Sequence, residues 1–166
     1  MASLPSQDTR HLSRLTTAAK LAQIRPAAPV EVEPSGQVQT TRLLIRPLIW
    51  LDRASYIDAV KASRPELDRF CPPHNPGESD AELFDRQLQL AAAAISTQRA
   101  MRCVAIDTSR DHRVVGVINL NDIGYGLEAA AEATLWVRSD DAGRGFGREM
   151  LNAIVAHAFL PRIARR

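Results

Sequence analysis

The sequence predicts an α+β domain, in which helices accompany a small antiparallel sheet. Apolar residues at helical spacing dominate the segment before residue 98, whereas short β-rich runs separated by tight turns follow it. Near the end of the chain, a glycine-rich turn leads from the last of these runs into a further helix. The period of the hydrophobic pattern therefore changes along the chain, and no internal repeat accompanies the change.

Length and composition narrow the class of protein. The 166 residues suffice for one domain with some additional sequence. The formal net charge is +2 and the basic residues are scattered, so nothing indicates a nucleic-acid partner. Cys71 and Cys103 are too few for a disulfide framework or a cysteine-rich zinc site. No apolar run suits a membrane span or a secretory signal, and we expect a cytoplasmic protein.

Residues 1–38 differ from the rest in being rich in Ser, Thr, Ala, Pro and Gln. Two interpretations remain open, namely a basic, Ser-rich organelle transit peptide and a disordered or flexible extension. Low hydrophobicity alone explains this composition, which favours the extension. A linker is expected around Pro26, Pro29, Pro34 and Gly36. We expect the folded domain to span residues 39–166.

Order is expected to begin with a strand in residues 41–48, near a sheet edge because of Pro47. Asp52 is placed to cap a helix, which Pro65 interrupts, and residues 71–77 form a loop. The apolar residues of this first helix are Tyr56, Ile57 and Val60.

A second helix is predicted by Ser79 and Glu82, which have the spacing of a capping box. The pair satisfies free amides at the helix start, and apolar residues then repeat every three or four positions. The expected apolar face consists of Phe84, Leu88, Ala92 and Ile95.

Three strands are predicted in residues 101–107, 114–121 and 132–138. Residues 109–112 form the first turn between them, and Gly124 and Gly126 mark the second. The last strand alternates, with Ala133, Leu135 and Val137 on one side and Glu132, Thr134, Trp136 and Arg138 on the other. Short strands with tight connections predict an antiparallel meander.

The glycine turn at Gly143, Gly145 and Gly147 precedes a helix predicted from residue 146 to about 159, with Pro161 ending it. Glycines bare the backbone at the helix start. Free amides and the helix dipole both favour negative charge there, so the turn predicts a site for a phosphate-bearing ligand.

Other phosphate and metal motifs do not match. A dinucleotide fingerprint counted from Gly143 would need glycine where Arg148 stands, and the preceding strands are hairpins. The Gly-Lys-Ser/Thr end of a Walker motif is absent from the turn. His74 follows Cys71 by three residues, but no second pair completes four metal ligands.

Residues 41–159 resemble the GNAT superfamily of acetyl-CoA-dependent N-acetyltransferases, and most closely the branch that acetylates ribosomal-protein N-termini. Three segments carry the resemblance in the right order: residues 41–48, residues 114–119 with Gly116, and residues 131–137 leading into the glycine turn. The resemblance implies an α/β three-layer type of α+β fold, with a mixed, mainly antiparallel sheet flanked by helices.

The resemblance also implies how the cofactor binds. The pyrophosphate of coenzyme A is held by the backbone amides of Gly143, Arg144, Gly145, Phe146, Gly147 and Arg148. The strand before the turn pairs its backbone with the pantetheine arm at Leu135, Trp136 and Val137. The side chains of Arg144 and Arg148 either help neutralise the phosphates or are merely exposed. Trp136 is expected to pack in the core rather than form a substrate platform.

In this family a substrate amine attacks the thioester after a base removes a proton, often through water. Glu132 is the candidate base, with a solvated strand-end charge as the alternative. Asn119 is the candidate that orients a water, with an ordinary polar strand residue as the alternative. The expected function is transfer of an acetyl group to a primary amine, either a protein N-terminus or a small amine.

The chain departs from the family in two places. Ala142 stands where an Arg or Gln normally contacts the pyrophosphate. Residues 160–166 end the sequence where the family continues, with Arg162 and Ile163 expected to begin the next strand. A tyrosine acid is missing there, since Tyr56 and Tyr125 lie elsewhere.

An incomplete C-terminal part would leave the edge of the strand at 132–138 open, and such an edge invites pairing, for example in a homodimer. The alternative function is therefore a truncated, inactive relative that binds coenzyme A weakly or pairs strands with a partner.

Overall fold

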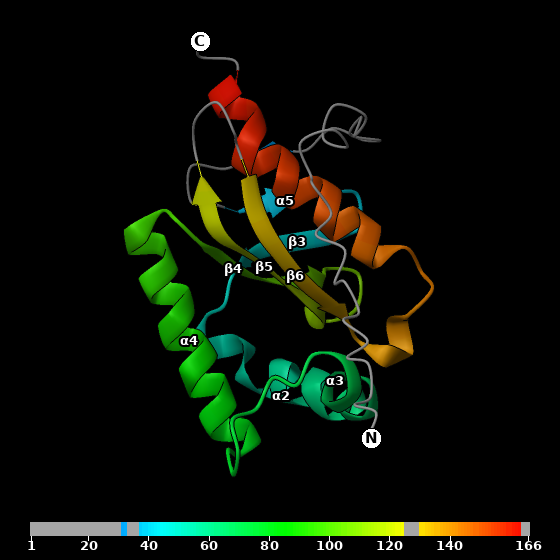
Figure 1. Cartoon of the computed structure of the whole chain (residues 1–166). Helices are drawn as coiled ribbons and strands as arrows, with labels where there is room; N and C mark the ends of the chain where they lie inside the picture. The colour runs from blue at the N-terminus through cyan, green and yellow to red at the C-terminus, as the bar shows by residue number, and fades with distance from the viewer. Residues whose placement is uncertain (1–30, 33–36, 125–129, 164–166) are drawn as a thin grey trace, which may run out of the picture.

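The computed structural model describes residues 31–32, 37–124 and 130–163, with side chains over residues 37–124 and 130–158. A six-stranded sheet in the order β1-β2-β3-β4-β5-β6 forms the centre, and every neighbouring pair in it is antiparallel (Figure 1). The strands are β1 Glu31–Val32, β2 Val38–Gln39, β3 Leu43–Pro47, β4 Met101–Asp107, β5 Arg113–Gly124 and β6 Ala130–Val137.

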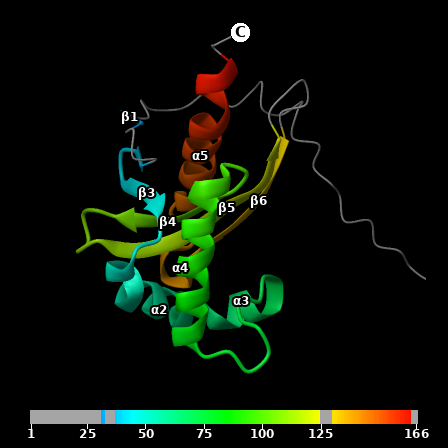
Figure 2. The same ribbon diagram turned by 90° about the vertical axis from the view of Figure 1, so that its left-hand side faces the viewer.

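Helices lie on both faces of this sheet. Their bounds are η1 Trp50–Asp52, α2 Arg53–Ala62, α3 Arg64–Phe70, α4 Asp80–Thr97, η2 Ser139–Asp141 and α5 Phe146–Ile163. Figures 1 and 2 show α5 running along one face of the sheet, while α4, with α2 and α3, lies on the other side. Within the described residues, no helix combines the length and apolar character that crossing a bilayer requires.

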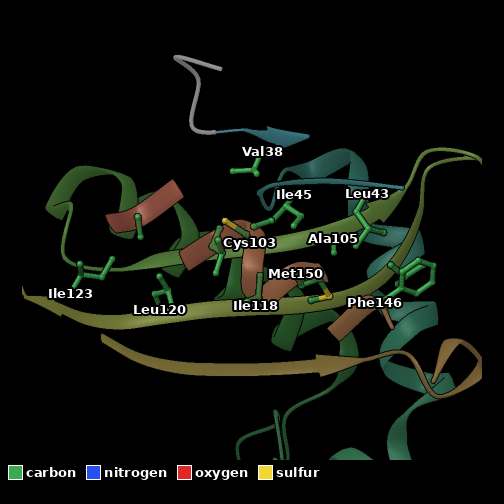
Figure 3. Close-up of a cluster of buried hydrophobic side chains, with 14 residues drawn as sticks. Val38, Leu43, Ile45, Cys103, Ala105, Ile118, Leu120, Ile123, Phe146 and Met150 are labelled. Carbon is green, nitrogen blue, oxygen red and sulfur yellow. The ribbon is translucent and has the colours of Figure 1, made fainter. Parts of the chain in front are cut away.

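The face under α5 carries one of two apolar clusters (Figure 3). The close-up shows side chains of β3, β4 and β5 directed toward those of α5, among them Ile45, Ile118 and Met150. Gly116 permits this approach, because a Cβ there would lie 2.6 Å from the Trp136 carbonyl oxygen and 3.1 Å from the Met150 methyl group. The glycine therefore sets how closely α5 packs on the sheet.

The opposite face carries the second cluster, which joins α2, α3 and α4 to the sheet. Aromatic rings organise it, with Tyr56 in edge contact with Phe84 at 5.6 Å and with Trp136 at 6.4 Å between ring centroids. Trp136 thus packs against core residues, as the sequence predicts. We call this face the α4 face and the other the α5 face.

Several local predictions are confirmed. The meander is formed by β4, β5 and β6, whose register pairs Ala105 with Gly116 and Gly116 with Val137. In β6, Leu135 and Val137 pack on the α5 face and Trp136 on the α4 face, as the alternation predicts. The Ser79 and Glu82 capping box starts α4, with the Glu82 amide donating to the Ser79 hydroxyl.

The N-terminal boundary needs correction. Residues 31–32 form β1 and Val38 begins β2, so order starts before residue 41 and Val38 belongs to the folded part. Val38 is fully buried under α5, a tertiary contact that local composition does not reveal. Residues 1–30, and the expected linker residues Pro26, Pro29, Pro34 and Gly36, lie outside the described residues.

Two helix predictions are also corrected. In α4, Ala92 and Ile95 are exposed, whereas Ala91 and Ala94 are buried, because the buried stripe includes Leu83 as well as Phe84 and steps of four residues from Phe84 drift away from it. The backbone of α5 continues through Pro161 to Ile163, so the proline lies in the last turn of the helix rather than after its end. Arg162 and Ile163 are therefore helical and do not begin a strand.

Other details differ in a smaller way. Asp52 is the N-cap residue of α2, but its carboxylate accepts hydrogen bonds from the Arg46 guanidinium at 2.7 and 2.8 Å and from the Ile49 amide. Instead of capping the helix, Asp52 thus forms an ion pair that joins β3 to the start of α2.

Pro65 lies in the first turn of α3, which continues in helical conformation after α2. Gly126 and Tyr125 lie outside the described residues.

Candidate functional site

The glycine turn joins η2 to α5 in a conformation that requires glycine. Gly143 has φ 75° and Gly145 has φ 81°, in the left-handed region that side chains disfavour. A Cβ at Gly143 would meet no atom within 4 Å, and one at Gly145 only Nη2 of Arg42 at 3.7 Å. Glycine is therefore needed here for the backbone path, and the space over the turn is open.

The helix start beneath this space has free amide groups. The Glu149 amide donates to the Gly145 carbonyl at 3.1 Å, which is an ordinary helical hydrogen bond. The amides of residues 146–148 precede it in the helix and have no intrahelical acceptor by helix geometry. Amides and helix dipole together favour negative charge at this helix start, and phosphate binding by the turn stays a prediction.

An ion pair ties the β2–β3 region to this turn. Arg42 donates from Nη1 to the Arg144 carbonyl at 3.0 Å and from Nε to Glu149 at 2.8 Å. Thr40 donates to the same Glu149 carboxylate at 2.5 Å. The Arg42 guanidinium also lies 4.5 Å from the centre of the Phe146 ring. We call Thr40, Arg42 and Glu149 the loop clamp, because they hold the turn against the sheet.

A buried carboxylate braces the turn from its other side. Asp141 is 1% exposed, and its Oδ1 lies 2.9 Å from Arg110 and 3.0 Å from Arg144, while its Oδ2 lies 3.4 Å from Arg113. Burial favours the neutral acid, but the Arg110 hydrogen bond and the neighbouring arginine charges outweigh it, so the pKa of Asp141 lies below its usual value. Asp141 thus fastens the turn to the β4–β5 hairpin.

The two predicted arginine side chains lie in different surroundings, and their role toward the phosphates stays a prediction. Arg144 pairs with Asp141, and its guanidinium lies 5.2 Å from the Phe146 ring centre. Arg148 is exposed on the first turn of α5. Ala142 is exposed too and brings no side chain toward the turn. Arg42 is a cation beside the turn that the sequence does not single out, since it comes from the connection between β2 and β3, 102 positions before Arg144.

The backbone of β6 borders this turn. Its inner edge pairs with β5 through Leu135 opposite Ile118 and Trp136 opposite Val117. Within the described part of the chain β6 is the last strand of the sheet, and its outer edge has no partner strand. Pairing of that edge with a second copy stays a prediction.

The two candidate catalytic residues lie on the α4 face of adjacent strands. Glu132 is exposed on β6, opposite Asn121 of β5. Asn119 donates to the Thr134 hydroxyl at 3.5 Å, and Thr134 is its partner across the ladder. The structure therefore brings Glu132 and Asn119 to one face, two positions apart along the ladder.

A small cavity of about 10 Å³ opens on the α4 face next to Asn119, with room for roughly one water molecule. Its polar lining comes from Tyr56, Gln87, Arg102 and Asn119, and its apolar lining from Leu48, Ala91, Cys103, Val104 and Val117. Burial raises the pKa of the Tyr56 hydroxyl, so it stays protonated.

Tyr56 is thus nearer to the candidate site than the sequence suggests. The alternation of β4 could have placed Arg102 on the same side of the strand as Val104, because the two residues are two positions apart. Only the register between β4 and β5 shows that Arg102 lies opposite Asn119. Among the described residues, no group of three or more metal-ligating side chains is assembled.

Comparison with protein families finds one match. The family model described as "Acetyltransferase (GNAT) domain" matches residues 42–165, which is most of the chain. No curated protein matches the chain significantly.

Solved structures share the fold. A Vibrio cholerae protein assigned as a ribosomal-protein-serine acetyltransferase is 19% identical with a TM-score of 0.64, over 77% of this chain and 69% of that one. A ribosomal-protein-S5-alanine acetyltransferase from Vibrio fischeri is 18% identical with a TM-score of 0.59, over 75% and 68%. Mycobacterium smegmatis RimJ, in complex with CoA-disulfide, is 21% identical with a TM-score of 0.60, over 80% and 60%. The expected α+β architecture is confirmed.

Proposed function

Because the chain belongs to the GNAT acetyltransferase family, we propose that it transfers an acetyl group from acetyl-CoA to a primary amine. The observation that carries this proposal is the open glycine turn at the start of α5, with left-handed Gly143 and Gly145 and free amides behind them. The fold neighbours support the amine class, because their names include acetyltransferases of ribosomal proteins and a spermidine N-acetyltransferase chimera.

The residues at the turn fit the pyrophosphate of coenzyme A. The amides of residues 143–148 would hold the phosphate oxygens, and Arg148 is free to add a positive charge at the rim. The outer edge of β6 at Leu135, Trp136 and Val137 would pair with the amide groups of the pantetheine arm. Bound in this way, acetyl-CoA would present its thioester beside the polar groups of β5 and β6.

The acceptor amine must lose a proton before its lone pair can attack. Glu132 accepts that proton, directly or through a water that Asn119 orients. A new bond between nitrogen and the acetyl carbon forms as the bond between that carbon and sulfur breaks, and the sulfur leaves with the electron pair and takes up a proton. A β6 backbone amide donates to the thioester oxygen as negative charge develops on it.

We also propose that the protein works in the reducing cytoplasm.

The two cysteines, Cys71 and Cys103, are both free, the first exposed and the second buried. Burial raises the pKa of the Cys103 thiol to about 12, so it is inert as a nucleophile at neutral pH. Direct attack by the amine therefore fits the described residues better than an acetyl-cysteine intermediate on Cys103.

The proposal is tested by thiol release from acetyl-CoA with a panel of amines and the full chain. We expect release above the rate without enzyme, and Glu132→Gln to lower kcat roughly hundredfold while coenzyme binding stays unchanged, as for removal of a general base. Release no faster than without enzyme across the panel would overturn the proposed transfer.

Coenzyme binding is tested separately with a matched pair of glycines. Gly145→Ala and Gly77→Ala both force alanine into the left-handed region, at a cost of roughly 1–2 kcal/mol each. Only Gly145 lies in the turn, so we expect calorimetry to show weaker coenzyme A binding for Gly145→Ala alone. If both variants bind coenzyme A with equal affinity, the glycine turn is not part of the coenzyme A site.

A further inference from the structure

A diagonal row of three polar side chains, on the strands β4, β5 and β6, crosses the α4 face, and the ladder partner of Arg102 itself is Asn119. Arg102 donates from Nη2 to the Asn121 side-chain oxygen at 3.3 Å. Asn121 stands directly opposite Glu132 in the ladder between β5 and β6. The backbones of β4 and β6 lie two strand spacings apart, about 10 Å, and the Asn121 side chain stands between the Arg102 guanidinium and Glu132.

The two charges in this row do not pair with each other or with their described neighbours. Among the described residues, no carboxylate lies within 4.0 Å of the Arg102 guanidinium, whose polar partner is the neutral amide of Asn121. Glu132 likewise has no ion-pair partner in the described part of the chain. By contrast, two arginines beside the glycine turn pair with acids, Arg42 with Glu149 and Arg144 with Asp141.

Arg102 also lines the small cavity beside Asn119, together with the neutral polar side chain of Gln87. The lining contains no acid, so a positively charged substrate group gains nothing in this cavity. The cavity has room for only about one water molecule, so a substrate carboxylate would bind at its mouth. There it would meet the guanidinium of Arg102 and the amide of Gln87, and charge-assisted hydrogen bonds of this kind are the strong ones.

From this row we propose that the acceptor is a primary amine with a carboxylate a few bonds away, its amine directed to Glu132 and its carboxylate to Arg102. This inference rests on the proposed acetyl transfer and narrows its substrate class. Arg102 determines specificity in this arrangement, and a polyamine, which carries only positive charge, is a poor acceptor. A free amino acid and a protein N-terminus with an acidic second residue share the required chemistry.

The experiment compares acceptors that differ only in the carboxylate. Serine is paired with serine amide, and Ser-Asp amide with Ser-Asn amide, while spermidine represents the polyamines. A preference for serine over its amide identifies a free amino acid, whereas a preference for Ser-Asp amide over Ser-Asn amide identifies an acidic N-terminus. We expect kcat/KM for at least one carboxylate-bearing member to exceed that of its neutral partner roughly tenfold to hundredfold.

Variants of Arg102 assign the preference to this side chain. We expect Arg102→Gln to remove the preference through KM, Arg102→Lys to keep part of it, and Arg102→Glu to shift selectivity toward spermidine. Arg99→Gln is the matched control, because Arg99 is exposed, lies three residues earlier and does not line the cavity. Thermal melting of each variant checks that it is folded.

The outcomes separate this inference from the proposed function. Acetylation that favours the neutral acceptors or spermidine, or a carboxylate preference that survives in Arg102→Gln, overturns the inference and leaves acetyl transfer intact. If no amine is acetylated, the proposed function fails, and calorimetric binding of Ser-Asp amide and serine then decides the inference. Binding that is weaker in Arg102→Gln than in Arg99→Gln supports it, and equal or absent binding overturns it.

Discussion

At the scale of single residues, Asp141 is the most constrained acid near the glycine turn. Its carboxylate is buried and approached by Arg110, Arg113 and Arg144, which come from the β4–β5 hairpin and from the turn itself. Removing one member of a buried charged group leaves the others uncompensated, at a cost of about 3–5 kcal/mol. Asp141 therefore contributes to the fold and to the shape of the turn at once.

The pH dependence of stability follows from the lowered pKa of Asp141. The acid is ionised in the folded state at a lower pH than in the unfolded state, where its pKa is about 3.9. Its contribution is therefore fully present above that pKa and is lost as the pH falls through the folded-state pKa. Asp107, whose pKa is also lowered although burial opposes this, acts in the same direction through its bonds to Ser109 and Arg110.

We expect the unfolding free energy to fall between pH 5 and pH 3, in a window around the unfolded-state pKa of about 4. Asp141→Asn should reduce stability at pH 7 by several kcal/mol, of the order cited for buried pairs, and flatten this pH profile. Asp140→Asn is the control, because Asp140 is half exposed and its pairs with Arg113 and Arg138 contribute about 1 kcal/mol or less. Urea unfolding from pH 3 to 7 measures both, and identical profiles for the two variants would contradict the assignment.

At the scale of elements, the loop clamp links the start of β3 to the first turn of α5. Glu149 places a negative charge close to the expected phosphate position, and Arg42 neutralises it through its Nε and Nη2 atoms at 2.8 and 2.5 Å. The loop clamp thus has two effects. It holds the glycine turn in place, and it neutralises the charge of the Glu149 carboxylate. The two effects predict different outcomes for variants.

We expect Arg42→Gln to weaken coenzyme A binding about tenfold, an effect of roughly 1.4 kcal/mol, because the Glu149 carboxylate then repels the phosphates. The double variant Arg42→Gln/Glu149→Gln should recover most of the affinity, since it removes the repelling charge. Calorimetry at low and high salt measures this, with screening expected to reduce the effect. If the double variant binds as weakly as Arg42→Gln, the clamp acts only by bracing the turn.

At the scale of the whole molecule, the sheet carries an apolar cluster on each face and so couples α5 to α2, α3 and α4. Ile154 of α5 and Leu83 of α4 are both fully buried, on opposite faces. Both clusters use side chains of β4 and β5, such as Cys103 and Val104, which alternate between them. Loss of either cluster therefore removes support from the strands that carry the other.

We expect Ile154→Ala and Leu83→Ala each to cost about 2–5 kcal/mol within a single unfolding transition. Tryptophan fluorescence reports mainly the α4 face, where Trp136 packs and the Trp50 ring lies against Phe84. Circular dichroism reports all helices, α5 included. Coincident urea curves by both probes are expected for both variants, and separate transitions would show that the two layers unfold independently.

The sequence predicts much of the domain because many of its signals are local. The capping box of Ser79 and Glu82, the alternation of β6 and the glycine turn each depend on residues within a few positions. Predictions failed where a distant surface decides the outcome. Val38 is ordered because α5 covers it, and Ala91 rather than Ala92 is buried in the cluster that joins α4 to the sheet.

The sequence by itself determined the element types, the meander and the glycine turn before α5, since backbone propensity and hydrophobic period are properties of short segments. Only the tertiary structure decided which charges meet. Arg42 and Glu149 are 107 positions apart. Arg102, Asn121 and Glu132 share one face because β4, β5 and β6 lie side by side and the Arg102 side chain reaches diagonally to Asn121. Charge partners depend on register and on the crossing of distant elements, and those follow from packing the whole chain.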